Sequence, residues 1–222
     1  MRILGIDEAG RGPVFGSLFI GGVLIDDSLN DELKKIGVKD SKLLTNQQRE
    51  NLYRKVNEMA DEVHYVEITA SEIDDKRKYM SLNEIEAMKM AECIEMFDQS
   101  KIDKVIFDLP EPNGNRFIGK VQKYFDFRQP AIAEHKADVN YPAVSCASII
   151  AKERRERSLK PIYDQFGFFG SGYTHDPRSI ELLERLADHA EYPDFVRRSW
   201  DTAIQARNRK NQSSLMDFNK SK

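Results

Sequence analysis

The sequence predicts an α/β fold in which a central mixed sheet of five strands carries helices on both faces. Three strands come early in the chain, and the later strands alternate with helical segments. Short runs of β-branched residues indicate strands, and apolar residues at a spacing of three or four indicate helices packed on them. With 222 residues, of which 40% are apolar, the chain is long enough for one large domain with a sizeable core.

The five strands are expected at short apolar runs. The first two, at 2–7 and 17–26, flank a turn rich in glycine, and the third, at 63–68, alternates apolar with polar residues. The fourth is the buried run 104–108, which a Leu-Pro pair ends, and a loop over 111–115 follows it. The fifth strand is expected at 131–135.

Capping residues and prolines mark where helices begin. Thr45 precedes a polar helix over 46–59, and Ser81 with Glu84 forms a capping box. Further helices are expected to start near Pro142 and at Pro177. The spacings place on buried faces Leu82, Ile85, Met88, Ala91 and Ile94 in one helix, Cys146, Ile149 and Ile150 in the next, and Ile180, Leu183 and Leu186 or Ala187 in the last.

Charge is distributed unevenly along the chain. Residues 196–222 carry a net charge of +5, whereas residues 1–195 carry −8, which hints at a polyanionic partner. We therefore divide the chain into a domain at 1–195 and a basic helical extension at 196–222, whose last residues, from Asn211 on, are expected to be flexible. The only cysteines, Cys93 and Cys146, are expected to be reduced core residues. Without a membrane segment or signal peptide, we expect a cytoplasmic monomer.

The segment Asp7-Glu8-Ala9-Gly10-Arg11-Gly12-Pro13 carries the strongest chemical signal. Two carboxylates at a strand end suit Mg²⁺, which prefers oxygen ligands, and bare backbone N–H groups beside them suit phosphate and sugar oxygens. A dinucleotide-binding loop is disfavoured, because that motif needs a helix next and residues 17–25 predict a strand. The segment indicates metal-assisted phosphodiester chemistry.

Two further carboxylates stand at element boundaries. Asp108 ends a buried strand, and Asp138 precedes the helix that begins near Pro142. Together with Asp7 and Glu8 they would form one acidic pocket, whose mutual repulsion a divalent metal resolves. Because successive strand residues face opposite sides, Asp7 and Glu8 share this site only if the chain leaves regular strand geometry at Glu8.

Over nearly its whole length the sequence resembles type 2 ribonuclease H, in particular archaeal ribonuclease HII. The resemblance implies a ribonuclease H-like fold with a catalytic domain at 1–195. Besides the segment from Asp7 to Pro13, the motifs that carry it are Asp40-Ser41-Lys42-Leu43-Leu44-Thr45, Ser81-Leu82-Asn83, Phe107-Asp108-Leu109-Pro110, Lys136-Ala137-Asp138, the run from Ser145 to Lys152, and Gly170-Ser171-Gly172-Tyr173.

The resemblance also implies an activity: hydrolysis of the RNA strand of RNA–DNA hybrids and cleavage 5′ of ribonucleotides embedded in duplex DNA, leaving 3′-hydroxyl and 5′-phosphate ends. Asp7, Glu8, Asp108 and Asp138 would hold two Mg²⁺ or Mn²⁺ ions. The turn Gly10-Arg11-Gly12 would read the 2′-hydroxyl, and Tyr173 would pack on the next deoxyribose. Ser41 and Lys42 would contact phosphate.

Some residues allow two interpretations. Asn83 either supports a metal ligand or begins a helix, and His175 is expected to be an exposed loop residue. Gln212, Leu215 and Phe218 resemble a peptide that docks on the sliding clamp, although Asn219 replaces the expected second aromatic. We expect the basic residues of the extension to touch duplex phosphates; these are Arg197, Arg198, Arg207, Arg209 and Lys210.

Two other functions are alternatives to the ribonuclease. One is a nuclease of the wider ribonuclease H-like superfamily that cuts DNA junctions, which the glycine turn and Tyr173 disfavour because they discriminate sugars. The other is a non-catalytic module that binds nucleic acid or the clamp. Four acids near a polyanion disfavour that module, because a binding module has no reason to gather them.

Overall fold

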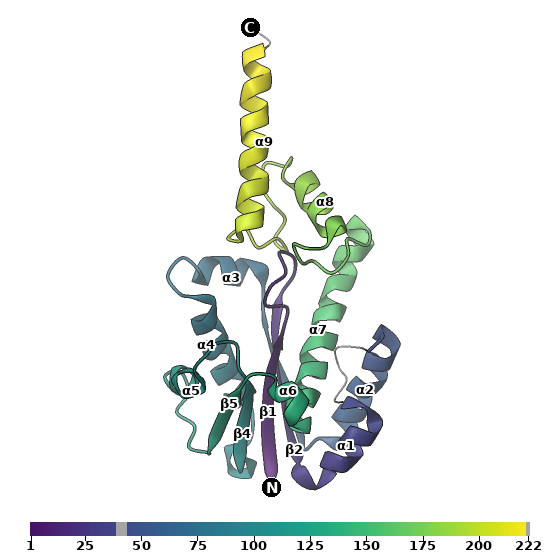
Figure 1. The fold of residues 1–222 in the computed structure, drawn as a ribbon, viewed down its shortest axis with the longest axis vertical. Coiled ribbons are helices and arrows are strands. Elements are labelled where there is room, and N and C mark those ends of the chain that lie inside the picture. The colour runs from purple at the N-terminus through teal and green to yellow at the C-terminus, as the bar shows by residue number, and fades with distance from the viewer. Residues whose placement is uncertain (39–43, 221–222) are drawn as a thin grey trace.

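A computed structural model describes residues 1–38 and 44–220, with side chains placed up to residue 210. Five strands form one sheet in the order β3-β2-β1-β4-β5, with β1 at its centre (Figure 1). β1 pairs antiparallel with β2 and parallel with β4, which confirms the predicted mixed sheet. The strands are β1 (Arg2–Ala9), β2 (Leu18–Asp26), β3 (Glu62–Ile68), β4 (Lys104–Asp108) and β5 (Ala131–Glu134).

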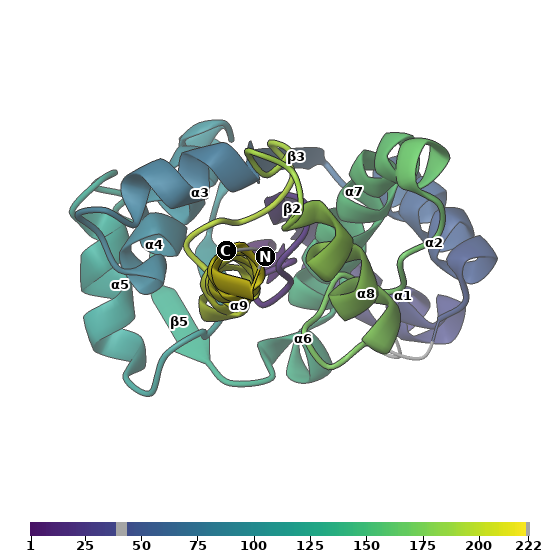
Figure 2. The same cartoon turned by 90° about the horizontal axis from the view of Figure 1, so that it is seen from above.

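Helices cover both faces of this sheet. α7 lies against β1 and β2 on one face, with α1 and α2 beside it, and α4 and α5 cover the other face (Figures 1 and 2). The helices are α1 (Asn30–Ile36), α2 (Asn46–Met59), α3 (Ala70–Lys76), α4 (Leu82–Glu95), α5 (Gly114–Gln122), α6 (Ala137–Asn140), α7 (Pro142–Phe166), α8 (Pro177–Leu186) and α9 (Asp201–Lys220), with single 3₁₀ turns at Asp27–Leu29 and Gln99–Lys101.

The predicted helix starts are confirmed. Thr45 caps α2, Ser81 and Glu84 form the capping box of α4, and prolines stand first in α7 and α8. Of the side chains expected on buried faces, Leu82, Met88 and Ile180 are only half-buried, and the others are buried. The short helices α1 and α3 were not predicted, and α5 begins inside the segment that was expected to be a loop.

Two glycines determine how closely α7 approaches the sheet. A Cβ at Gly5 in β1 would overlap the backbone of Ala143, and a Cβ at Gly21 in β2 would overlap the carbonyl oxygen of Ala147. The backbone of α7 therefore rests directly on the two central strands. Next to this contact Cys146 is buried, and both cysteines of the described chain are free and buried, as predicted.

The C-terminal part of the chain packs on the far end of β1. A hydrophobic cluster there joins Phe15 to Phe169, with ring centroids 5.2 Å apart, and to residues of α8 and α9. Val196 forms an isolated antiparallel bridge with Phe15. α9 then rises away from the body (Figure 1). No helix in the described ranges is long and apolar enough to cross a membrane.

The helix α9 continues to Lys220, where the sequence analysis expected a flexible segment from Asn211 on. The stretch 201–220 contains no glycine or proline, the two residues that most strongly interrupt a helix, so nothing in it forces an earlier end.

Candidate active site

Strand register brings two of the predicted carboxylates together. β1 and β4 run parallel, and Ile6 of β1 pairs with Phe107 of β4. Asp7 and Asp108 follow these two residues directly, at the carboxyl ends of neighbouring strands. In open α/β sheets this edge is where ligands bind. The side chain of Asp7 is buried, and Asp108 accepts a hydrogen bond from the Ala137 backbone N–H at 2.8 Å.

The backbone at Glu8 keeps regular strand geometry. β1 continues through Glu8 to Ala9, and both stay in register with β2, so the chain does not leave strand geometry at Glu8. The ladder with Ile20 and Phe19 holds it, and Gly10, with φ of +89°, is the first residue to turn away. The departure from strand geometry that was the condition for Asp7 and Glu8 to share a site therefore does not occur at Glu8. The carboxylate of Glu8 nevertheless feels the charge of Asp108.

The fourth carboxylate, Asp138, lies at the start of α6 and is buried. The backbone N–H of Ala137, the residue before it, donates to the carboxylate of Asp108. From α7, the Ser145 hydroxyl donates to the backbone carbonyl of Asp138. The two contacts fix the backbone on both sides of Asp138 near the end of β4.

The site carries more negative charge than its surroundings compensate. Burial, together with the charges of Glu8 and Asp108, raises the pKa of Asp7 well above its ordinary value. Burial and the charge of Asp108 raise the pKa of Glu8 to about 7, although the Arg11 guanidinium opposes this rise. A cation placed among these groups would relieve both their repulsion and their desolvation.

The donor set fits a hard divalent cation. All four groups offer carboxylate oxygens, and one oxygen of Glu8, Oε2, is buried without a hydrogen-bond partner. Among the residues that the structure describes, no three His, Cys, Asp or Glu side chains already converge as metal ligands. The chemistry of the four groups therefore suits a divalent ion.

Arg11 is held by a network of polar side chains on α4 and beyond. It forms an ion pair with Glu86, which is fully buried, and donates to Asn83 Oδ1 at 2.7 Å. Asn83 in turn donates to Glu111 at 3.0 Å, and Lys120 donates to the same carboxylate at 2.6 Å. Asn83 thus stands at the start of α4, as one of its two interpretations predicted, and it also orients Arg11, which neither interpretation had foreseen.

A groove of about 220 Å³ joins the acidic edge to the glycine turn and Tyr173. A Cβ at Gly12 would lie 3.1 Å from the Tyr173 ring, so turn and ring are in close contact. His175 is exposed, as expected, with its ring centroid 5.4 Å from that of Tyr173. The structure therefore brings Glu8, Gly10, Arg11 and Tyr173 together in one groove.

Three basic side chains of this groove were missed by sequence reasoning: Arg49 of α2, and Lys152 and Arg155 of α7. The spacing of Lys152 and Arg155 puts them on one helix face, and Lys152 ends a motif already singled out, so a signal existed for these two. The guanidinium of Arg49 forms an ion pair with the carboxylate of Glu153 on α7, with Nε and Oε2 3.5 Å apart. No local sequence pattern predicts this contact.

Several predicted residues are either outside the described part of the chain or away from the groove. Ser41 and Lys42 are outside the described residues, as are the side chains of Gln212, Leu215 and Phe218. The expectation that Arg197 touches duplex phosphates was wrong, because Arg197 is fully buried. Other basic groups of the extension also bond to the protein itself: Arg207 to backbone carbonyls, Arg209 to Glu184, Arg198 to Asp194, and Lys210 to Asp188.

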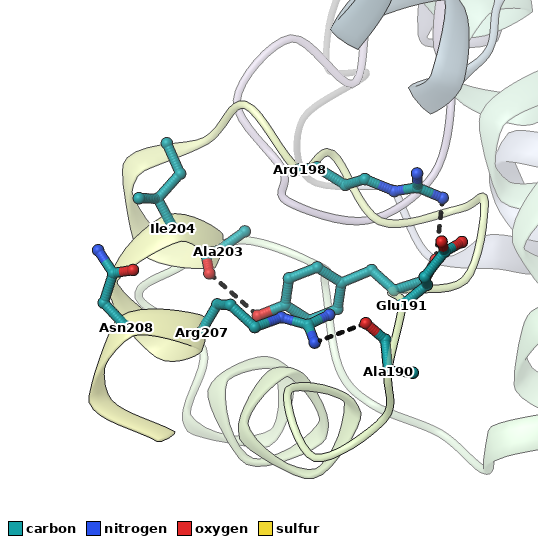
Figure 3. A pocket seen from close by; sticks show the side chains of 8 residues that line it. Ala190, Glu191, Arg198, Ala203, Ile204, Arg207 and Asn208 are labelled. Carbon is teal, nitrogen blue, oxygen red and sulfur yellow. Dashed lines mark hydrogen bonds between the residues drawn. The ribbon is translucent and has the colours of Figure 1, made fainter. Parts of the chain in front are cut away.

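A second cavity, of about 350 Å³, lies between α9 and the segment that follows α8 (Figure 3). The Tyr192 hydroxyl donates to the Ala203 carbonyl at 3.0 Å, and Arg207 donates to the Ala190 carbonyl at 3.1 Å. Arg198 donates to the Tyr192 carbonyl at 2.9 Å. These bonds fasten α9 to the body, and none of the predicted catalytic or sugar-reading residues lines this cavity.

The sheet order, the helices on both faces and the acidic edge define a ribonuclease H-like fold. The model of the family Ribonuclease HII matches residues 4–203. A relative named ribonuclease HII, from Pyrococcus horikoshii OT-3, is 42% identical over 221 residues, covering 98% of this chain and 99% of its own.

Solved structures agree with this match. The crystal structure of ribonuclease H2 from Pyrococcus horikoshii OT3 superposes with a TM-score of 0.87 at 40% identity, covering 94% of this chain and 98% of the other. A second is ribonuclease HII from Archaeoglobus fulgidus in its PCNA complex, with a TM-score of 0.81, 35% identity, and coverage of 90% and 96%. The chain belongs to the ribonuclease HII family and is a type 2 ribonuclease H, an endonuclease.

Proposed function

We propose that the protein hydrolyses the RNA strand of RNA–DNA hybrids and cuts on the 5′ side of a ribonucleotide embedded in duplex DNA, leaving 3′-hydroxyl and 5′-phosphate ends. The observation that carries the proposal is the groove that joins Glu8 to the glycine turn and Tyr173. It places groups suited to reading a sugar next to groups suited to hydrolysing the adjoining phosphodiester.

The carboxylates would hold the divalent ions. Asp7, Glu8, Asp108 and Asp138 are the proposed ligands, and Mg²⁺ or Mn²⁺ suits their oxygen donors. When bound, such ions would supply an activated water and stabilise the leaving oxygen. The residues themselves contribute charge: the raised pKa values of Asp7 and Glu8 reflect a pocket whose anionic form needs a cation nearby.

The glycine turn and Tyr173 would select the sugar. Because Gly10 and Gly12 have no side chains, a nucleotide can approach their backbone closely enough for one hydroxyl to be sensed. The ring of Tyr173, packed against Gly12, offers a flat face for the following deoxyribose, where an added 2′-hydroxyl would clash. Arg49, Lys152 and Arg155 in the same groove would favour the polyanionic backbone.

The test is cleavage of a DNA duplex that carries one ribonucleotide, with Mg²⁺ or Mn²⁺. We expect a single cut 5′ of the ribonucleotide, lost in Asp108→Asn and retained in Asp103→Asn. Asp103 is a suitable control because it stands just before the opposite end of β4 and is exposed. Cleavage of all-DNA junctions instead would indicate the junction nuclease, and binding without any metal-dependent cut would indicate the non-catalytic module.

We further propose that the C-terminal segment docks on a sliding clamp through Gln212, Leu215 and Phe218. The Archaeoglobus fulgidus relative was solved in complex with PCNA, and α9 rises clear of the body here (Figure 1). Truncation after Asn211 should abolish clamp binding while cleavage of a short duplex persists. Clamp binding that survives the truncation would rule this segment out.

A further inference from the structure

Arg197 is the largest fully buried side chain of the described protein. Its guanidinium donates to the carbonyl oxygens of Gly16 at 3.0 Å, Arg11 at 2.8 Å and Gly10 at 2.5 Å. Arginine is rarely fully buried unless it is paired. The hydrogen bonds of this guanidinium go to backbone carbonyls, and burial lowers the pKa of Arg197 to about 9.

Neighbouring groups of the same segment complete the contact. The Trp200 indole N–H donates to the Gly12 carbonyl at 3.1 Å, and the Arg197 guanidinium lies 4.8 Å from the Trp200 ring centroid. The backbone N–H of Arg197 donates to the Val14 carbonyl at 2.9 Å. The segment thus holds successive carbonyls of the turn from one side.

Peptide geometry determines the direction of the backbone N–H groups of the turn. In a trans peptide the C=O and the following N–H point in opposite directions, and no cis peptide occurs among the described residues. Because Arg197 holds the carbonyls of Gly10 and Arg11, the N–H groups of Arg11 and Gly12 are directed away from it. The groove with Tyr173 is lined by Gly10 and Arg11.

We propose that Arg197, assisted by Trp200, is a positioning residue for sugar selection: it sets the glycine turn so that the turn's backbone can read the 2′-hydroxyl of the substrate. This inference rests on the proposed function. A cation that only stabilised the fold could bond any carbonyls, whereas two of the three bonds of this guanidinium go to the turn beside the acidic edge. Arg197 itself lies behind the turn and touches no substrate.

The experiment compares full-length wild type with Arg197→Met, Arg197→Lys and Trp200→Phe. Binding is measured with Ca²⁺ replacing Mg²⁺, on a duplex with one ribonucleotide and on the same duplex in all-deoxy form. Ile25→Ala serves as the control for lost stability, because Ile25 pairs with Ile3 at the opposite end of β1. The kcat and KM for cleavage are measured in parallel.

We expect Arg197→Met to lower the ribose-over-deoxyribose affinity ratio about tenfold and kcat/KM by about 10- to 100-fold, as small misplacements do. Arg197→Lys should restore part of the ratio, Trp200→Phe should lower it less, and Ile25→Ala should leave it unchanged. Should Arg197→Met fail to fold, Arg197→Lys and Trp200→Phe decide the question. A wild-type ratio in all the Arg197 and Trp200 variants that fold would overturn the inference, whereas a wild type without preference would overturn the proposed function itself.

Discussion

The ion pair between Arg11 and Glu86 allows a sharp test of how the turn is anchored to α4. Glu86 is fully buried, one of its oxygens has no hydrogen-bond partner, and the Arg11 side chain is 34% exposed. Replacing Arg11 by alanine leaves the Glu86 carboxylate buried in the core without its cationic partner. Replacing Glu86 by glutamine instead removes the buried charge and keeps the shape.

The magnitude follows from the burial of the two partners. Removing one member of a buried pair costs about 3–5 kcal/mol, and the partial exposure of Arg11 lets water offset some of that. We expect Arg11→Ala to cost about 2–3 kcal/mol of unfolding free energy and Glu86→Gln about 1 kcal/mol. The double variant should be more stable than Arg11→Ala alone, because it leaves no buried charge unpaired.

Urea denaturation of the wild type and the three variants measures this coupling. At this chain length each kcal/mol corresponds to roughly 2–4 °C in Tm, so thermal scans provide a second reading. Arg54→Ala is the matched control, since Arg54 pairs with Glu50 at 2.7 Å on an exposed helix face and should cost under about 0.5 kcal/mol. If the Arg11 and Glu86 effects add within about 0.5 kcal/mol, the pair is not coupled and the reasoning fails.

Three further outcomes are expected. Burial raises the pKa of Cys146 to about 12 and also raises that of Cys93, so native protein at pH 8 should not react with a thiol reagent, whereas denatured protein should lose both thiols. Gly5→Ala should destabilise by at least about 1–3 kcal/mol in urea denaturation, because its Cβ would overlap Ala143. Hydrogen bonds hold the pKa of Asp176 below its ordinary 3.8, so its stabilisation is present above that pH and lost as the pH falls; Asp176→Asn should therefore be less stable than wild type at pH 7 and about equal to it at strongly acidic pH.

Local signals predicted the frame of the fold well. Thr45 and Ser81 mark helix starts because their side chains satisfy free backbone N–H groups, which is a property of a few neighbouring residues. The meeting of Asp7 and Asp108 was predictable too, since carboxyl ends of parallel strands share one edge. α5 was missed because Gly114 opens it directly after a stretch of loop-forming residues.

What sequence reasoning missed depends on distant partners. Arg197 was expected at the surface, since a charged residue near a chain end is usually solvated, yet its partners at Gly10 and Arg11 lie 187 and 186 positions earlier. The inward orientation of Arg49 likewise depends on Glu153, far along the chain. Local composition does not predict contacts between residues so far apart in the chain.

The contact between Arg197 and the glycine turn also sets an order of events during biosynthesis. The turn leaves the ribosome well before the groups that hold its carbonyls, which are made 186 to 188 positions later. A growing chain can assemble the first strands early, because domains fold as their N-terminal parts emerge. The glycine turn acquires its final form only after Arg197 and Trp200 have been made. A chain still being made therefore holds Asp7 and Glu8 before the groups that fix the glycine turn exist.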